Sequence, residues 1–562
     1  MLGIHRQYVR ETYDSQGRLT HFGLNVPDDF SFPFDVVDEI ARRAPQKPAM
    51  IWCNPQGEEH LFTFADMREQ SCRAANFFKS LGIAKGDRVM LLLKRHYEYW
   101  FAVLGLHRIG AVAIPGVAML TAKDLVYRFE AASVKAVVCT ADGDTADCVD
   151  EAQAQAPGVR HKIIARGRRA GWLSFHEGLA AASPDFARPR GAGATRVCDP
   201  MLMYFTSGTT GLPKMVAHDY SYPLGHIITA KHWQHVQPDG LHLTVADTGW
   251  AKAGWGKIYG QWLMETCLFV YDFDRFDSED LLEKMERYGV TSFCAPPTIY
   301  RFFIKGGMEG HTLPALRYAT TAGEALNAEI FRRFYEITGV RIMEGFGQTE
   351  SVVLIGNLFG TTPKPGSLGR PVPLFHIELI DEAGRPVAPG ETGEIAVDVS
   401  GGHPAGLFTG YYRDPESTRK VWHDGWYHTR DTAWKDEDGY LWYVGRTDDV
   451  IKSSGYRIGP FEIESVLMEH PAVLECAITA APDPVRGQVV KATIVLTRDY
   501  LPTDELAQEL KDYVKHQTAP YKYPRIVEFV DELPKTASGK IRRAELRRQA
   551  FNPVPRRSEA EE

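Results

Sequence analysis

The chain has 562 residues, too many for one compact core at roughly 100–200 residues per domain, so we expect a large part of several lobes and at least one further domain. Hydrophobic residues make up 44% and aromatic residues 11% of the sequence, which excludes wholesale disorder. The formal net charge is −8, from 64 Lys and Arg against 72 Asp and Glu. This balance argues against a surface dedicated to nucleic acid or anionic membrane.

Three features bear on where the protein works. Apolar stretches such as Trp100–Leu106 stop well short of the roughly 20 residues that a membrane-spanning helix needs. The first residues are polar, and Glu11 and Asp14 argue against a transit peptide. The eight cysteines are scattered, with no C-x-x-C pair and no histidines at zinc-finger spacing, which favours reduced thiols. Together these features predict a cytoplasmic protein without a membrane span.

Helical and strand patterns alternate through most of the chain. Residues 63–82 have apolar side chains at helical spacing, with Thr63 as an N-cap, Asp66 three residues on and Gly82 at the end. The strand-like run RVMLLL (88–93) follows. The same order recurs where a helical stripe ends at Gly289 and VTSFCAP follows. This alternation predicts an α/β fold of layered sheets and helices.

The pattern changes in the last third of the chain. From about Phe375, short strand-like runs broken by Gly and Pro predict a β-rich subdomain. Beyond Asp449 we expect a compact α+β unit with a helix near 460–469, a strand at 489–496 and an amphipathic helix at 503–517. We therefore predict a large N-terminal domain, 1–446, and a small C-terminal domain, 447–562.

The strongest local signal is TSGTTGLPK, from Thr206 to Lys214, directly after the apolar run MLMYF. Two glycines let backbone N–H groups approach oxygen atoms, the hydroxyl side chains donate hydrogen bonds, and Lys214 supplies a positive charge. Such a loop is suited to holding phosphate groups. Its spacing is not that of a Walker A motif, so ordinary P-loop chemistry does not follow.

Further segments follow this loop in a recognisable order. They are AGEAL (322–326), EGFGQTE (344–350), DTAWKDEDGY (431–440), GRTDDVIKSSGYRIGPFEIE (445–464) and PKTASGKIRR (534–543). With TSGTTGLPK, this set resembles the adenylate-forming superfamily, which includes acyl-CoA synthetases, peptide-synthetase adenylation domains and firefly-type luciferases. The resemblance implies an N-terminal domain that binds AMP and the acyl group, and a mobile C-terminal domain that carries a catalytic lysine.

The resemblance assigns roles at the nucleotide. It implies that Glu350 binds Mg²⁺, whose preferred ligands are hard oxygens, that Phe346 lies against adenine, and that Asp431 and Arg446 contact the ribose. The other residues at nucleotide-contacting positions are Thr206, Ser207, Gly208, Thr209, Thr210, Gly211, Lys214, Gly323, Glu324, Ala325, Glu344, Gly345, Gly347, Gln348, Thr349 and Lys540.

Lys540 matches the lysine that bridges the substrate carboxylate and the α-phosphate in the family. An isolated lysine in a TASGK loop would ordinarily be solvated, and only the surrounding segments favour a catalytic role. There it would neutralise charge as the carboxylate attacks phosphorus and pyrophosphate leaves. With Glu350 and Thr206, Lys540 is a predicted catalytic residue. Its context also resembles a site of regulatory acetylation, which implies a lysine acetyltransferase and deacetylase as partners.

The second half of the reaction is implied in the same way. Asp448 matches the family's hinge position, and Arg457 matches a contact to the active site. After rotation of the C-terminal domain, a passage for the pantetheine arm of CoA would form, and Gly455 would leave room in it. The CoA-contacting positions are Ser454, Gly455, Tyr456, Arg486, Lys515 and Tyr523.

Branches of the superfamily differ in the segments that form the acyl pocket. DTGWAKAGWGKIYGQW (247–262) and TAPYKYPR (518–525) resemble the medium-chain acyl-CoA synthetase branch. The expected pocket residues are Trp233, Trp250, Lys252, Trp255, Cys294 and Gly347. A short apolar slot lined by tryptophans favours compact acids, although some of these tryptophans could equally be core residues.

These observations predict an ATP- and Mg²⁺-dependent acid–CoA ligase that forms acyl-CoA, AMP and pyrophosphate through an acyl-adenylate. Short- or medium-chain and branched acids are the expected substrates, and an aryl-CoA ligase acting on benzoate-like acids is the alternative. The motifs do not separate a ligase from a luciferase-like enzyme, because the first half-reaction is shared. The resemblance also implies a homodimer.

Overall fold

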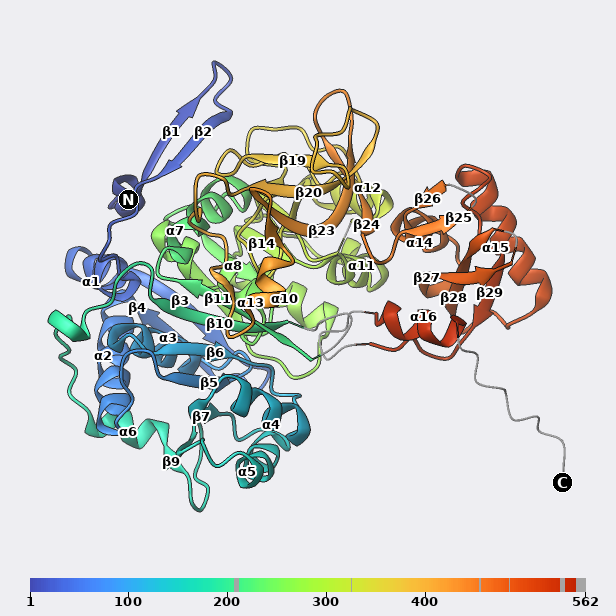
Figure 1. Ribbon diagram of the computed structural model, residues 1–562. Helices are drawn as coiled ribbons and strands as arrows, with labels where there is room; N and C mark the ends of the chain where they lie inside the picture. The colour runs from blue at the N-terminus through green and yellow to red at the C-terminus, as the bar shows by residue number, and fades with distance from the viewer. Residues whose placement is uncertain (207–211, 325, 454–455, 485, 536–540, 552–562) are drawn as a thin grey trace, which may run out of the picture. The chain divides into compact units, whose positions relative to one another are not determined.

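The computed structural model describes residues 1–206, 212–324, 326–453, 456–484, 486–535 and 541–551, with the side chains of 456 and 457 excepted (Figure 1). Their backbone forms two compact units. The first contains residues 1–206, 213–376 and 398–420, and the second contains residues 377–397 and the chain from 421 onward.

Two large, mostly parallel sheets form the frame of the first unit. In spatial order the eight-stranded sheet is β21 (Gly410–Tyr411), β11 (Lys214–Asp219), β10 (Pro200–Thr206), β6 (Val112–Pro115), β5 (Arg88–Leu92), β7 (Val134–Cys139), β8 (His161–Ile164) and β9 (Leu173–Ser174). The nine-stranded sheet is β18 (Arg370–Pro371), β17 (Ile355–Gly356), β16 (Ile342–Phe346), β15 (Tyr318–Thr321), β14 (Ser292–Ala295), β12 (Leu241–Thr244), β13 (Cys267–Tyr271), β3 (Pro48–Cys53) and β4 (Glu59–Thr63). A separate ribbon pairs β1 (Val9–Tyr13) with β2 (Leu19–Leu24).

Helices cover these sheets (Figure 1). They are α1 (Asp38–Arg43), α2 (Phe64–Ser80), α3 (Glu98–Ile109), α4 (Ala122–Ala131), α5 (Thr145–Gln155), α6 (Phe175–Ala181), α7 (Tyr222–Ile227), α8 (Ala251–Gly256), α9 (Tyr259–Leu263), α10 (Ser278–Tyr288), α11 (Pro297–Lys305), α12 (Ala328–Thr338) and α13 (Pro415–Arg419). Helices α2 and α3 pack closely because α3 has a glycine at the contact. A Cβ on Gly105 would lie only 2.7 Å from the Cβ of Ala74.

Local signals set the ends of several helices. Thr63 and Asp66 form a reciprocal capping box at the start of α2. Gly289 ends α10 in the left-handed region, at φ 68°. Both features, and the strands β5 and β14 that follow the two helices, confirm the sequence predictions.

The second unit contains two smaller sheets. One has the order β19 (Ile377–Ile380), β20 (Thr392–Asp398), β23 (Trp426–Lys435) and β22 (Trp422–His423), and β24 (Leu441–Arg446) pairs with β23. The other has the order β26 (Tyr456–Ile458), β25 (Ile451–Ser453), β28 (Gly487–Leu496) and β27 (Val473–Asp483), and β29 (Ile526–Phe529) pairs with β28. The helices are α14 (Pro460–Leu467), α15 (Asp504–Gln517) and α16 (Arg543–Phe551).

The predicted α/β class, with a large N-terminal part and a smaller α+β C-terminal part, is confirmed. Helix α15 buries Leu506, Leu510 and Val514 on one face, as its periodicity predicts. The domain boundary at 446/447 stays a prediction. Within the described residues, no helix combines the length and apolarity required to cross a bilayer.

Candidate functional site

The phosphate-loop motif connects two antiparallel strands. Thr206 is the last residue of β10, Lys214 is the first residue of β11, and the two are paired in register. The residues between them that carry the prediction, Ser207 to Gly211, lie outside the described residues. The Nζ of Lys214 lies 4.6 Å from the ring centroid of Tyr411 on the neighbouring strand β21, a distance typical of a cation–π contact.

Tyr411 also contacts the predicted magnesium ligand. Its hydroxyl donates a hydrogen bond of 2.9 Å to Oε1 of Glu350, and the backbone N–H of Phe408 donates to the carbonyl of Glu350 at 2.7 Å. One tyrosine therefore brings together Lys214 and Glu350, which are 136 residues apart in the chain. Sequence reasoning missed Tyr411 because no motif includes it.

The EGFGQTE segment begins on β16, where the side chain of Glu344 is buried. Burial raises the pKa of Glu344 to about 8. Its Oε1 accepts a hydrogen bond of 3.1 Å from the backbone N–H of Leu326. This contact joins the EGFGQTE and AGEAL segments. In AGEAL, Gly323 has φ 103°, Glu324 accepts a hydrogen bond from Thr298 at 3.1 Å, and Ala325 lies outside the described residues.

The rest of EGFGQTE is held by local and long-range contacts. The backbone N–H of Gln348 donates to the hydroxyl of Ser351 at 3.0 Å. The carbonyl of Thr349 accepts a hydrogen bond of 2.8 Å from Nε2 of His218 on β11. Phe346 is the last residue of β16 and pairs with Ile355 of β17. This segment is thus attached to both large sheets.

Two of the predicted pocket tryptophans lie together against this segment. The rings of Trp233 and Trp255 are 5.9 Å apart and nearly perpendicular. A Cβ on Gly345 would lie 2.5 Å from Trp233, and a Cβ on Gly347 would lie 2.4 Å from Trp255. Glycine is therefore required at both positions for the indoles to approach the backbone.

The other predicted pocket residues are more dispersed. Lys252 on α8 donates a hydrogen bond of 2.9 Å to the carbonyl of Ala322, next to the AGEAL glycine. Cys294 is buried on β14. Trp250 packs against the hydrophobic core beside the eight-stranded sheet. The lining of the acyl pocket by this whole set stays a prediction.

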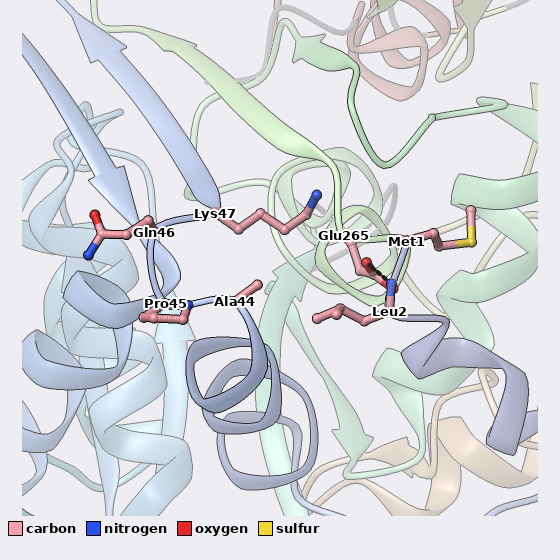
Figure 2. A pocket seen from close by; sticks show the side chains of 7 residues that line it. All are labelled: Met1, Leu2, Ala44, Pro45, Gln46, Lys47 and Glu265. Carbon is pink, nitrogen blue, oxygen red and sulfur yellow. Dashed lines mark hydrogen bonds between the residues drawn. The ribbon is translucent and has the colours of Figure 1, made fainter.

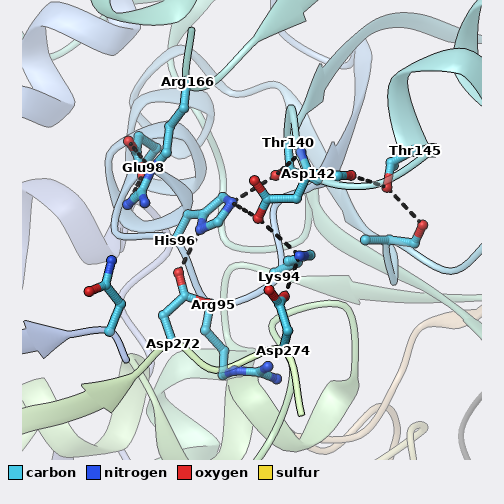
Figure 3. A network of polar contacts seen from close by, with 12 residues as sticks. Lys94, Arg95, His96, Glu98, Thr140, Asp142, Thr145, Arg166, Asp272 and Asp274 are labelled. Carbon is cyan, nitrogen blue, oxygen red and sulfur yellow. Dashed lines mark hydrogen bonds and ion pairs between the residues drawn. The ribbon is translucent and has the colours of Figure 1, made fainter. Parts of the chain in front are cut away.

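Figure 3 shows a network of charged and polar side chains around His96. His96 contacts Asp272 at 2.6 Å and Thr140 at 2.7 Å, and Lys94 pairs with Asp142 and Asp274. These residues follow the carboxyl ends of β5, β7 and β13.

The same network reaches the DTGW segment. The carbonyl of Lys94 accepts a hydrogen bond of 3.2 Å from the backbone N–H of Thr248, and Arg95 lies 3.6 Å from Asp247. Although burial lowers the pKa of His96, its hydrogen bonds to Asp142 and Asp272 outweigh that effect and raise the pKa to about 9. Lys94 and Arg95 therefore hold the segment that carries Trp250, and the charged His96 belongs to the same network.

In the second unit, Asp431 on β23 accepts a hydrogen bond of 2.9 Å from the hydroxyl of Tyr443 on β24. Asp431 is paired in register with Arg446, so the two predicted ribose contacts lie side by side on adjacent strands. Sequence reasoning missed Tyr443, which lies three residues before the Arg446 motif.

The predicted hinge residue is held in a bidentate ion pair. Arg430 donates to both carboxylate oxygens of Asp448, at 2.8 and 2.9 Å, and Arg547 on α16 donates to the Asp448 carbonyl at 2.6 Å. These contacts tie the 446–450 segment to both β23 and α16.

The residues predicted to contact CoA are described in part. The Nζ of Lys515 lies 5.7 Å from the ring centroid of Tyr523, and the backbone N–H of Arg486 donates to Asp483 at 2.7 Å. Tyr456 and Arg457 belong to β26, and their side chains are not described. Ser454, Gly455 and the catalytic candidate Lys540 lie outside the described residues.

A pocket elsewhere in the first unit is lined by Met1, Leu2, Ala44, Pro45, Gln46, Lys47 and Glu265 (Figure 2). The carboxylate of Glu265 accepts hydrogen bonds from the backbone N–H groups of Leu2 and Gly3, at 2.6 and 2.5 Å. The pocket contains none of the predicted site residues, and its one carboxylate is already committed to the backbone. We assign it no part in the reaction.

Within the described residues, no group of three or more His, Cys, Asp and Glu side chains is arranged to hold a metal ion. A single protein carboxylate suits Mg²⁺ that arrives with substrate phosphates. A Gly- and Thr-rich strand connection, a carboxylate near its lysine and an adjoining pair of indoles are the arrangement expected of an enzyme that binds a nucleotide and a small organic substrate.

Comparison with known proteins identifies the family. The chain belongs to the AMP-binding enzyme family: residues 37–412 match the family's AMP-binding enzyme model, and residues 462–540 match the model of its C-terminal domain. The chain is 39% identical to the acyl-coenzyme A synthetase ACSM3, mitochondrial, of Rattus norvegicus, over 97% of this chain and 95% of the relative. It is 42% identical to ACSM5, mitochondrial, of Mus musculus, over 94% and 92% of the two chains.

The solved structure of the anthranilate CoA ligase AuaEII in complex with anthranoyl-AMP is also similar. It has a TM-score of 0.84 and 28% sequence identity, and the match covers 93% of this chain and 98% of that chain. The predicted membership of the adenylate-forming superfamily, in the medium-chain branch, is confirmed. The protein is an AMP-forming acyl-CoA synthetase that uses ATP, Mg²⁺ and CoA.

The predicted location is wrong. The curated relatives are named mitochondrial acyl-CoA synthetases, which point to the mitochondrion rather than the cytoplasm. The prediction relied on reduced, scattered cysteines and on the charges of the first residues. Reduced thiols fit any reducing compartment, so they could not distinguish between the two.

Proposed function

We propose that this synthetase activates compact carboxylic acids, of short or medium chain or branched, and that the predicted residues carry out the two half-reactions. One observation carries the proposal: the segment that holds Glu350 also supplies Gly345 and Gly347, which lie directly against Trp233 and Trp255. The expected metal ligand and the expected acyl slot are therefore built on one stretch of chain.

In the first half-reaction, an oxygen of the substrate carboxylate attacks the α-phosphorus of ATP, and pyrophosphate leaves. Glu350 would hold Mg²⁺, which neutralises phosphate charge when it is bound. Thr206 and Lys214 would position the phosphates from the two ends of the loop, and Lys540 would bridge the carboxylate and the α-phosphate. Asp431 and Arg446 would fix the ribose.

In the second half-reaction, the thiol of CoA loses its proton and attacks the carbonyl carbon of the acyl-adenylate, and AMP leaves. The adenylate is a mixed anhydride, so water has to be excluded until the thiol arrives. A C-terminal domain that turns about Asp448 would remove Lys540 and bring up the pantetheine passage at Gly455. The resting pair between Arg430 and Asp448 would then have to break or turn with the segment.

The first test is pyrophosphate release from ATP with a panel of acids, each with and without CoA. The panel extends from acetate through branched and straight acids of four to ten carbons to benzoate and phenylacetate. We expect sustained turnover that requires both an acid and CoA. Equal release without CoA, or without any acid, would contradict the thioester half of the proposal.

The role of Lys540 is tested by separating the half-reactions. Lys540→Ala should reduce adenylation by about a hundredfold to a thousandfold, in line with the loss of one preorganised group, while thioester formation from supplied acyl-AMP stays nearly intact. Lys535→Ala is the matched control in the same segment, since Lys535 pairs with Glu475 at 2.7 Å. Equal loss of both half-reactions in Lys540→Ala would remove its assigned role.

An aryl-CoA ligase is the second candidate. The similarity to an anthranilate CoA ligase and the aromatic character of Trp233 and Trp255 favour it, because a planar ring packs well against an indole. The acid panel decides between the two.

Regulation and assembly are further parts of the proposal. Acetylation of Lys540 by a lysine acetyltransferase would remove its charge and should stop adenylation, and a deacetylase would restore it. Full activity in a stoichiometrically acetylated sample would contradict this.

Family resemblance supports a homodimer. The molecular mass in solution, measured by light scattering, would test this.

A further inference from the structure

Four buried polar side chains lie close together near Trp255 in the first unit. They are Tyr204 on β10, His218 on β11, and Tyr222 and His226 on α7. Each is at most 2% exposed. The hydroxyls of both tyrosines, Nδ1 of His218 and Nε2 of His226 have no hydrogen-bond partner among the described residues. Buried polar atoms are nearly always paired, so four in one place require an explanation.

The four side chains are neighbours in space. The ring of Tyr222 lies 3.9 Å from that of His218 and 4.5 Å from that of His226, centroid to centroid. The ring of Tyr204 lies 6.3 Å from that of His218. They form one cluster, which we call the hydroxyl site.

The hydroxyl site borders the predicted acyl slot through α8. Gly254 precedes Trp255, and a Cβ on Gly254 would lie 3.0 Å from the hydroxyl of Tyr204 and 3.3 Å from that of Tyr222. Both hydroxyls thus lie close to the position that a side chain at 254 would occupy. The ring of His226 lies 6.2 Å from that of Trp255, and Trp255 donates its single N–H to the carbonyl of Ser351 at 3.1 Å.

The donors and acceptors of the site can be assigned. Burial raises the pKa of both tyrosines, so their hydroxyls keep their protons and can donate. Burial lowers the pKa of His218 to about 3, so its imidazole is neutral. Its Nε2 contacts the carbonyl of Thr349, which can only accept, so Nε2 carries the hydrogen and Nδ1 is an acceptor.

We propose that this hydroxyl site binds an alcohol or phenol group carried by the acid substrate at the end remote from its carboxylate. A hydroxyl oxygen accepts two hydrogen bonds and donates one, which matches two tyrosine donors and one histidine acceptor. The inference rests on the proposed function, because it makes the preferred substrate a hydroxylated member of the compact acids that the slot would admit.

Other ligand groups match the site less well. A second carboxylate would have to be buried with no cation among these four residues to compensate it, and an ammonium would meet two donors. A hydrocarbon end would leave all four polar atoms unpaired, at a cost of about 1–3 kcal/mol for each. An ordered water could pair with the same atoms, so it is the competing occupant that the experiment has to exclude.

The experiment compares matched acids in the CoA-dependent pyrophosphate assay on the full-length enzyme. Each plain acid is paired with its singly hydroxylated forms: benzoate with 3- and 4-hydroxybenzoate, and hexanoate with 5- and 6-hydroxyhexanoate. We expect the hydroxylated member of at least one pair to have a kcat/KM about tenfold higher or more, because sites built to bond a hydroxyl reject the analogue that lacks it.

Variants connect that preference to the site. Tyr204→Phe, Tyr222→Phe and Gly254→Ala should each bring the ratio of the two kcat/KM values towards one. The first two remove a donor, and the third crowds both hydroxyls. Tyr220→Phe is the matched control. Tyr220 is equally buried, but its hydroxyl already donates to the carbonyl of His107 at 3.0 Å, so its loss should leave the ratio unchanged.

The outcomes separate the two levels of inference. A preference for the hydroxylated acid that disappears in Tyr204→Phe and persists in Tyr220→Phe supports the site. Turnover of plain acids with no preference in any pair overturns the site alone and assigns the cluster to ordered water. A preference that survives in both Tyr204→Phe and Tyr222→Phe also overturns it. No CoA-dependent turnover with any acid would contradict the proposed function itself, and this inference with it.

Discussion

Two buried polar regions of the first unit differ in how their polar groups are paired. The network around His96 consists of charged groups that pair with one another, such as His96 with Asp272 and Lys94 with Asp142 (Figure 3). The hydroxyl site consists of neutral groups, and four of its polar atoms have no partner within the described part of the chain. Both regions adjoin the 247–255 segment: the network contacts Asp247 and Thr248, and the hydroxyl site contacts Gly254.

The difference separates structural from binding roles. The ion pairs of the first region form without a ligand, and Lys94 and Arg95 connect them to the DTGW segment. Unpaired neutral groups are costly in the empty protein, and that cost is recovered when a ligand supplies the missing partner. Burial alone therefore does not identify a binding site, but burial without a partner points to one.

The largest expected effect comes from breaking the paired network. His96→Ala should lower the free energy of unfolding of the first unit by about 3–5 kcal/mol, because it leaves the buried Asp272 without its partner. Because its folded-state pKa of about 9 lies above the ordinary 6.5, the stabilisation is fully present below about pH 6.5. It is lost as the pH rises through about 9. Denaturant titration at pH 6 and pH 9.5 measures both effects.

Asp274→Asn is the control for this experiment. Its side chain is 77% exposed, although it also pairs with Lys94, so its removal should cost under about 1 kcal/mol. Equal losses in the two variants would show that pairing at His96 contributes no more than a surface ion pair.

A smaller effect is expected at Lys257, which lies among the same charges. Burial disfavours the charged form of its side chain. Burial, with a further contribution from Arg95, lowers the pKa of Lys257 to about 7. Between pH 7 and 10.5 the unfolded chain therefore binds more protons, and the penalty for burying the ammonium disappears as the pH rises. Lys257→Met should stabilise the enzyme by about 1–4 kcal/mol at pH 6, and this gain should shrink towards pH 10.

The exposed Lys123 provides the matched control. Lys123→Met removes a lysine charge without removing a buried ammonium, so we expect no gain at pH 6. Thermal unfolding of both variants at several pH values measures the difference. A gain for Lys257→Met that does not depend on pH would mean that packing, not charge, is responsible.

The smallest effects compare two buried tyrosines. Tyr220→Phe should lose about 1 kcal/mol, because the carbonyl of His107 is left without its donor. Tyr204→Phe should lose no stability in the absence of substrate and should gain about 1 kcal/mol, since it removes a buried hydroxyl that has no partner among the described residues. Losses of equal size would indicate that water already pairs with Tyr204. Denaturant midpoints of the two variants, measured side by side, decide this.

Much of the fold was predictable because its signals are local. The capping box of Thr63 and Asp66 and the left-handed Gly289 lie within a few residues of the helix ends that they define. Thr206 and Lys214 likewise flank one loop. A helix or strand boundary depends on neighbours in sequence, so a single segment contains the information.

The contacts that build the site were not predictable in the same way. Tyr411 reaches Glu350 from 61 residues away, and His218 reaches Thr349 from 131 residues away. Gly347 could be assigned to the pocket by resemblance, but only the packed structure places it against Trp255. Such contacts depend on the order of strands in the sheets, which periodicity does not encode.

The sequence by itself determined the order of helices and strands, the phosphate-loop motif and the membership of the AMP-binding enzyme family, because each depends on residues close together in the chain. The tertiary structure alone decided which buried polar groups are paired. Tyr204, His218 and Tyr222 lie on three elements beside one another, yet their patterns resemble ordinary core positions. The hydroxyl of a buried tyrosine has a partner only if another element brings an acceptor or donor to it, and that is a property of packing.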